Sequence, residues 1–215
     1  MLVVGNDPEV VEADLAAGRI ACPDCGGRLG PWGFGIEREL RTLVGVRRLR
    51  PRRSVCAACR ATHVLEPAWT VARHRDSAEV IGAAWLAKAA GAGHRAIAER
   101  LGRSPSTVRR WLRRLAAGAE APRVRALEWT HHLDANAGPI ASAGSPLADA
   151  LEAVGVAVAA TARALGPRPA WELAVSLSGG LLVRPAPSRR GGVKGGPPAV
   201  PQGPSGARPL TPPGS

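Results

Sequence analysis

The chain has 215 residues and a formal net charge of +12, with one Phe, six Trp and no Tyr. This length allows one or two small domains, and no apolar run approaches the roughly 20 residues that cross a bilayer, so we expect a soluble protein without a membrane partner. The positive charge is concentrated, because the segment from Arg28 to Arg114 carries nineteen Lys and Arg against six Asp and Glu. Such a field is typical of a surface that binds a polyanion, although a solvated basic face without a partner would look the same.

Residues 1–20 predict a short N-terminal helix. Asp7 can cap it, Pro8 suits its first position, and Val10, Val11 and Leu15 form an apolar stripe. No basic region followed by an apolar stretch is present there, so we expect no signal peptide. The expected location is the cytoplasm, in association with the nucleoid, where thiols remain reduced.

Four cysteines, the only ones in the chain, form two CxxC pairs separated by thirty residues. Each pair places two sulfurs on one tight turn, and two such turns supply the four thiolates of a closed structural Zn²⁺ site. We therefore expect one structural zinc ion in a zinc ribbon over residues 21–67, with the ligands Cys22, Cys25, Cys56 and Cys59. Two disulfides or a redox CxxC are the alternatives. His63 could replace one thiolate, but we expect a surface histidine.

Short strands are predicted between and after the two pairs, at residues 32–34, within 44–55 and at 63–65. Successive strand residues face opposite sides, so the arginine-rich run before Cys56 must expose basic side chains on at least one face. Pro51 indicates an edge strand or a break. Arg47, Arg48 and Arg50 are therefore candidate DNA contacts.

Helical periodicity dominates residues 76–117, with predicted helices at 77–90, 94–101 and 104–115, the first capped by Ser77 or Asp76. Gly102 lies where a tight turn favours positive φ, Ala98 is small at the crossing point, and Ser104 and Pro105 begin the last helix. A shared core can form from Ile97, Leu101, Val108, Trp111 and Leu112. This pattern predicts a helix-turn-helix domain of the homeodomain-like type, with an ordinary helical hairpin as the alternative.

The last of these helices presents polar and basic side chains away from the core, and a recognition helix reads base edges in the major groove. The candidates for reading bases are Ser106, Arg109, Arg110 and Arg113, and Thr107 is a further candidate DNA contact. Arg95, Arg100 and Arg103 are expected to contact the DNA backbone.

Residues 118–183 predict a helical C-terminal region, with helices at 145–165 and 170–178. Trp129 and Trp171 are expected to anchor helix packing, and His131 and His132 to lie in a surface loop and not to form a metal site with Asp134. The apolar surface of this region could serve a homodimer or pack internally. Residues 184–215 are rich in Pro and Gly, and we expect a disordered tail. The predicted fold class is thus α+β, with a small ribbon followed by helices.

The order CPDCG, an Arg-rich strand into CAAC, THVLEPAW and STVRRWLRRL resembles the N-terminal DNA-binding modules of bacterial insertion-sequence transposases, and small actinobacterial-type proteins related to them. The resemblance covers residues 21–115, about half the chain, and implies element-end or operator DNA as the ligand. Transposases of the common type hold metal-binding carboxylates on a large α/β core. Few carboxylates and no strand series follow Leu115 here, so we expect no complete catalytic site and no enzyme activity.

The leading hypothesis is sequence-specific binding of double-stranded DNA, as a transposition-associated factor or a transcriptional regulator, and a transposase could be a partner. The alternatives are a truncated transposase subunit that needs a separate catalytic chain, and an RNA-binding zinc-ribbon protein.

Overall fold

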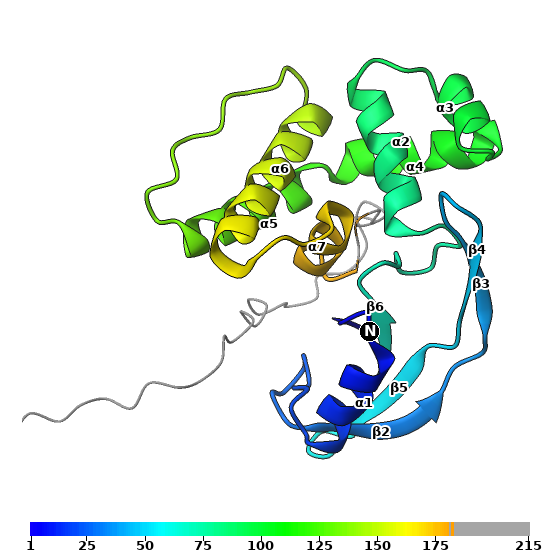
Figure 1. Cartoon of the computed structure of the whole chain (residues 1–215), viewed down its shortest axis with the longest axis vertical. Helices are drawn as coiled ribbons and strands as arrows, with labels where there is room; N and C mark the ends of the chain where they lie inside the picture. Colours follow the sequence, from blue (N-terminus) through cyan, green and yellow to red (C-terminus); the bar gives the residue numbers. More distant parts are fainter. Residues whose placement is uncertain (181, 183–215) are drawn as a thin grey trace, which may run out of the picture.

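The structure is a computed structural model that describes residues 1–180 and 182 (Figure 1). It confirms the α+β class, with strands in the N-terminal third and helices after it. The predicted disordered tail at 184–215 lies outside the described residues. The strands are β1 (Leu2–Val4), β2 (Leu29–Phe34), β3 (Arg38–Arg41), β4 (Val46–Leu49), β5 (Arg52–Cys56) and β6 (Thr62–Pro67). The helices are α1 (Pro8–Ala16), α2 (Ala78–Ala89), α3 (His94–Arg100), α4 (Pro105–Gly118), α5 (Glu120–Leu133), α6 (Pro146–Leu165) and α7 (Ala170–Leu177).

Residues 1–67, called the ribbon from here on, contain a four-stranded sheet in the order β1-β6-β5-β2 and a separate hairpin made by β3 and β4. Strand β1 runs parallel to β6, while β5 is antiparallel to both β6 and β2. Strand β1 was not predicted, because three residues are too few to show alternation and its pairing partner β6 is far along the chain. Helix α1 packs Val11 and Leu15 into the small ribbon core beside Leu29 and Leu65.

Three helices begin with the same local signal, a capping side chain followed by proline. Asp7, Ser104 and Ser145 each accept a hydrogen bond from a backbone N–H in the first turn of α1, α4 and α6, respectively. The acceptor satisfies a group that the helix leaves unpaired, and proline has no N–H to lose there. At α2 the cap is Ser77, whose Oγ accepts from the N–H of Val80 at 3.4 Å. The carboxylate of Asp76, the other candidate cap, instead pairs with the side chains of Arg41 and Arg103.

Helix α5 corrects the expectation that His131 and His132 lie in a loop. Both are exposed residues near the end of this helix, and the ring of His132 stacks on Trp129 with centroids 5.5 Å apart. The helix has only a narrow buried side, at Ala126 and Thr130, and Pro122 stands in its first turn. Its sequence therefore shows little periodicity.

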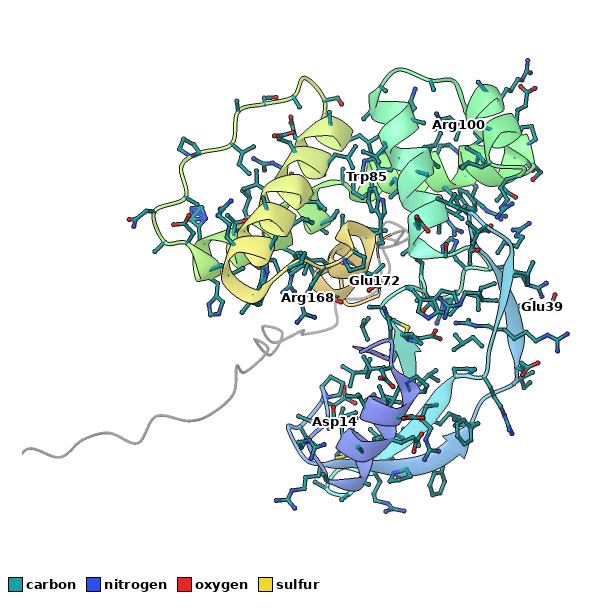
Figure 2. The ribbon with its side chains drawn as sticks, viewed as in Figure 1. Asp14, Glu39, Trp85, Arg100, Arg168 and Glu172 are labelled. Carbon is teal, nitrogen blue, oxygen red and sulfur yellow. The ribbon has the colours of Figure 1, made fainter. Side chains whose placement is uncertain are left out.

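The main core lies among the helices, where Trp85 is fully buried. Figure 2 shows Trp85 pointing from α2 toward the C-terminal helices, and its Nε1 donates to the backbone oxygen of Leu147 at 3.1 Å. Trp171 of α7 lies against it, with ring centroids 6.0 Å apart, and covers Gly82. Trp171 is thus a packing residue, as predicted. No helix of the described chain is both long and apolar enough to cross a membrane.

Candidate metal centre and nucleic-acid interface

The four cysteines meet at one point between the first turn of the ribbon and the turn from β5 to β6. All four Sγ atoms lie within 4.8 Å of one another. The Sγ atoms of Cys22 and Cys59 are 3.7 Å apart, and those of Cys25 and Cys56 are 3.5 Å apart. A tetrahedron with Zn–S bonds of about 2.3 Å has sulfurs roughly 3.8 Å apart, whereas a disulfide needs about 2.05 Å. The cysteines are free thiols whose spacing fits a metal ion.

The two CxxC turns are built alike. In the first, the N–H of Gly26 donates to the oxygen of Cys22 at 2.9 Å, and in the second the N–H of Arg60 donates to the oxygen of Cys56 at 3.1 Å. The residue after each second cysteine has a left-handed backbone, with φ of 74° at Gly26 and 64° at Arg60. Glycine adopts this conformation at little cost, but arginine does not. The second turn therefore carries local strain that the first avoids.

The four sulfurs lie close enough that their charges would repel one another if all were ionised. The backbone N–H of Cys59 is the main cause that lowers the pKa of Cys56 to about 6, against the effect of burial. The N–H of Ala61 lowers the pKa of Cys59, but the neighbouring sulfurs and burial together raise it to about 12. Four thiolates at this spacing repel one another, so they cannot all ionise unless a dication compensates their charge.

His63 is buried, at 5% exposure, which corrects the expectation of a surface histidine. Alternation along β6 places it on the same inner side as Leu65, and its Nε2 lies 3.4 Å from Sγ of Cys22. It also lies 3.8 Å from a carboxylate oxygen of Asp24. With four sulfurs already gathered, His63 is placed to donate a hydrogen bond to the sulfur of Cys22, an arrangement that is common around metal ligands.

Helices α2, α3 and α4 form the predicted three-helix unit. Gly102 in its turn has φ of 60°, and Ala98 is buried where α3 meets α4. The helices share a core to which α4 contributes Val108, Trp111, Leu112 and Leu115. The opposite side of α4 is exposed at Ser106, Arg109, Arg110 and Arg113, while Thr107 is half-buried beside the cap. Within residues 1–180, no carboxylate pairs with Arg109, Arg110 or Arg113.

Arg103 has a structural role that sequence analysis did not anticipate. Its side chain is only 11% exposed, and its Nε donates to Oδ1 of Asp76 at 2.6 Å. Its Nη1 donates to the backbone oxygen of Leu101 at 2.9 Å. The other oxygen of Asp76 accepts from Nη2 of Arg41 at 2.8 Å. These contacts engage Arg103 within the protein, whereas Arg95 and Arg100 are exposed on α3. Figure 2 shows Arg100 on this helix.

The three ribbon arginines singled out from the sequence are all exposed, but two of them also pack on aromatic rings. Arg47 lies over Trp69 at 4.3 Å, and Arg50 lies over Phe34 at 5.1 Å. Arg48 makes only a loose, exposed contact with Glu39 at 3.7 Å. Stacking orders the first two side chains and leaves their charge on the surface.

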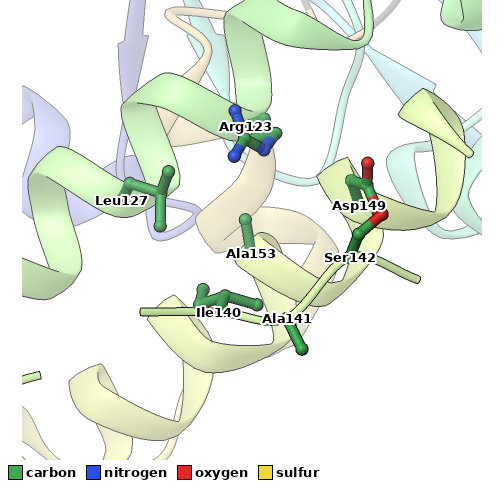
Figure 3. Close-up of a pocket in the computed structure, with 7 residues that line it drawn as sticks. All are labelled: Arg123, Leu127, Ile140, Ala141, Ser142, Asp149 and Ala153. Atoms are coloured by element: carbon green, nitrogen blue, oxygen red, sulfur yellow. The ribbon is translucent and has the colours of Figure 1, made fainter. Parts of the chain in front are cut away.

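A small hollow lies between α5 and α6, outside these sites (Figure 3). Its volume of about 60 Å³ has room for water but not for a substrate. Its carboxylate, Asp149, accepts hydrogen bonds from Ser142 Oγ at 3.0 Å and the N–H of Ala143. This group holds the loop between the two helices.

Residues 74–123 match a family model described as a homeodomain-like domain, which covers α2, α3 and α4 and the start of α5. The match identifies a helix-turn-helix domain, and this domain suggests that DNA is the partner. No curated protein and no solved structure matches the chain.

Proposed function

We propose that this protein binds duplex DNA in a sequence-specific manner, with α4 as the recognition helix in the major groove. The observation that carries the proposal is the division of α4 into two sides. One side fills the core of the homeodomain-like domain, while the other exposes Arg109, Arg110 and Arg113. Arginine can pair bidentately with O6 and N7 of guanine, so these side chains have the chemistry for reading bases.

The ribbon would add contacts to phosphates. Arg47, Arg48 and Arg50 supply exposed positive charge. With six to ten phosphate contacts in total, raising the salt concentration from 50 to 200 mM would lower the affinity for DNA by a factor of about 10³ to 10⁵.

Zinc would have a structural role here. Cys22, Cys25, Cys56 and Cys59 would hold one Zn²⁺ ion, which supplies a fixed tetrahedral link between the two turns. Four sulfur ligands leave no open coordination position for a reacting group, so we propose a DNA-binding protein and not an enzyme. Its biological setting would be the cytoplasm, as a regulator or a transposition-associated factor. A homodimer or a transposase partner would supply any second half-site.

The test is selection of bound genomic fragments by the zinc-loaded protein, with Arg109→Ala and Arg110→Ala as variants. We expect the wild-type protein to enrich a defined sequence, and each variant to lose preference at a specific base position, with a cost of about 1–3 kcal/mol. Arg163→Ala is the matched control, because it removes an exposed helical arginine from α6. Equal affinity for all duplexes would contradict the proposal, and metal-dependent nicking of bound DNA would contradict the absence of catalysis.

RNA binding is a second candidate, favoured by one observation on the ribbon. Trp32 and Phe34 on β2 are each about half exposed, and the guanidinium group of the exposed Arg50 lies over Phe34, whereas Arg52, also over this ring, is mostly buried. Exposed aromatic and arginine planes can stack on unpaired bases. Competition between the selected duplex and single-stranded RNA would decide: displacement at equal concentration favours RNA.

A further inference from the structure

The hairpin of β3 and β4 exposes apolar side chains at its tip. Leu43 is 48% exposed, Val44 98% and Val46 59%. The turn itself is ordered, because the N–H and Oγ1 of Thr42 both donate to the oxygen of Gly45 and the N–H of Val44 donates to Thr42 Oγ1. Exposed apolar residues grouped on a rigid turn usually mark a contact surface.

The hairpin is fixed to the helix-turn-helix domain close to the start of α4. The N–H of Arg41 donates to the oxygen of Arg75 at 2.8 Å, and the N–H of Ser77 donates to the oxygen of Arg41 at 2.9 Å. Asp76 then binds the side chains of both Arg41 and Arg103. Arg103 immediately precedes Ser104, the cap of α4. The base of the tip is therefore joined through Asp76 to the residue before α4, at the end of the helix that would approach the bases, and Figure 1 draws the hairpin on the same side of the molecule as α3 and α4.

The surroundings of the tip are positively charged. Arg47 and Arg48 follow it on β4, and both are exposed. Arg41 precedes it on β3 and keeps 45% of its side chain exposed even while paired to Asp76. An apolar tip between cationic flanks is complementary to a DNA groove, where phosphates line both edges and the bases form the floor.

We propose that the tip, formed by Leu43, Val44 and Val46, enters the minor groove next to the site of α4 and wedges between base steps, so that the protein bends its DNA. This inference rests on the proposed duplex binding and adds a second reading element. Apolar side chains inserted at a base step unstack it and kink the duplex by about 20–90°. The contacts of Asp76 hold the wedge in place while it does so.

The bend can be measured by energy transfer between dyes at the two ends of the selected duplex. A 2-aminopurine base placed next to the α4 site reports unstacking independently. We expect the zinc-loaded wild-type protein to bend the duplex and raise the 2-aminopurine fluorescence, and Val44→Ser and Leu43→Ser to lose most of both signals. These variants should fold, since the changed side chains are exposed. Val10→Ser is the matched control, at a 53% exposed valine on α1, and it should bend DNA normally.

The outcomes separate this inference from the proposed function. Wild-type protein that binds its selected duplex without a bend, or Val44→Ser that bends it fully, overturns the wedge and leaves DNA binding intact. Unchanged bending with loss of self-association in sedimentation would assign the tip to contact between two copies of this chain and also overturns it. If the wild-type protein binds no duplex at all, both proposals fail.

Discussion

Asp76 and Arg103 form a nearly buried ion pair, with Nε of Arg103 2.6 Å from Oδ1 of Asp76, at the point where the ribbon meets the helix-turn-helix domain. Because the second oxygen of Asp76 binds Arg41 of the hairpin, one carboxylate joins two parts of the chain.

Asp76→Asn would leave the Arg103 guanidinium largely desolvated without a counter-charge. We expect a loss of about 3 kcal/mol in the free energy of unfolding, measured by denaturant titration. Glu39→Gln, at an exposed and loose pair with Arg48, should cost less than about 1 kcal/mol. Equal losses would contradict this role.

The proposed zinc site predicts that replacing one cysteine removes the bound zinc. Cys56→Ser should reduce bound zinc from about one ion per chain to none and unfold the ribbon, because a structural site contributes its binding energy to folding. Metal analysis and circular dichroism measure the two effects. Ala58→Ser, at an exposed position in the same turn, should keep the zinc. Full zinc content in Cys56→Ser would show that the four sulfurs do not act together.

The two CxxC turns offer a matched pair of substitutions. Arg60→Gly should raise the free energy of unfolding by about 0.5–1 kcal/mol, because glycine relieves the left-handed backbone at this position. Gly26→Ala should lower it by about 1 kcal/mol through φ alone, since a Cβ there would meet no atom within 4 Å. Denaturant unfolding of the zinc-loaded protein tests both, and changes of the same sign would contradict the equivalence of the turns.

Packing of α7 on α2 depends on the missing side chain of Gly82. A Cβ at this position would lie 2.1 Å from ring atoms of Trp171. Gly82→Ala should therefore destabilise the protein by about 1–3 kcal/mol, despite alanine's higher helix propensity. Gly155→Ala in α6, where the added Cβ would meet nothing, should instead stabilise it by up to about 1 kcal/mol. Thermal melts distinguish the two, and a stabilising Gly82→Ala would disprove the contact.

His74 should make stability depend on pH. Burial and the charges of Arg114 and Arg110 lower its pKa below 6.5, although Asp76 works in the opposite direction. The unfolded chain then binds the proton more readily than the folded one, so stability is full above pH 6.5 and falls as the pH drops toward the folded pKa. His74→Gln should show a smaller loss between pH 7 and 5. The four cysteines are common to both proteins, so identical melting profiles would remove His74 as the cause.

The elements that could be predicted from the sequence are those whose signals are local. The caps at Asp7 and Ser104, the turn at Gly102 and the short strand at 63–65 depend on neighbouring residues, and the structure confirms these elements. The cysteine cluster was also predictable, because ligand spacing within each turn restricts the geometry. Whether those sulfurs hold zinc, and which arginines touch DNA, stay predictions.

What could not be predicted depends on partners distant in sequence. Asp76 looks like a helix cap in the sequence, and only the fold brings Arg41 and Arg103 to its two oxygens. The burial of His63 follows from pairing β6 in the middle of the sheet, between β1 and β5. Helix α5 was not predicted because it buries only Ala126 and Thr130, so its sequence lacks a clear helical repeat of apolar residues.

The two ion pairs of Asp76 also bear on the length of DNA that a single chain covers. With the hairpin tip and α4 held by the same carboxylate, neither can move along a duplex without the other. In the proposed binding mode, the distance between the bent step and the major-groove site is therefore a constant of the protein. Inserting a few base pairs between these two positions would therefore reduce the affinity as much as changing the bases that α4 reads.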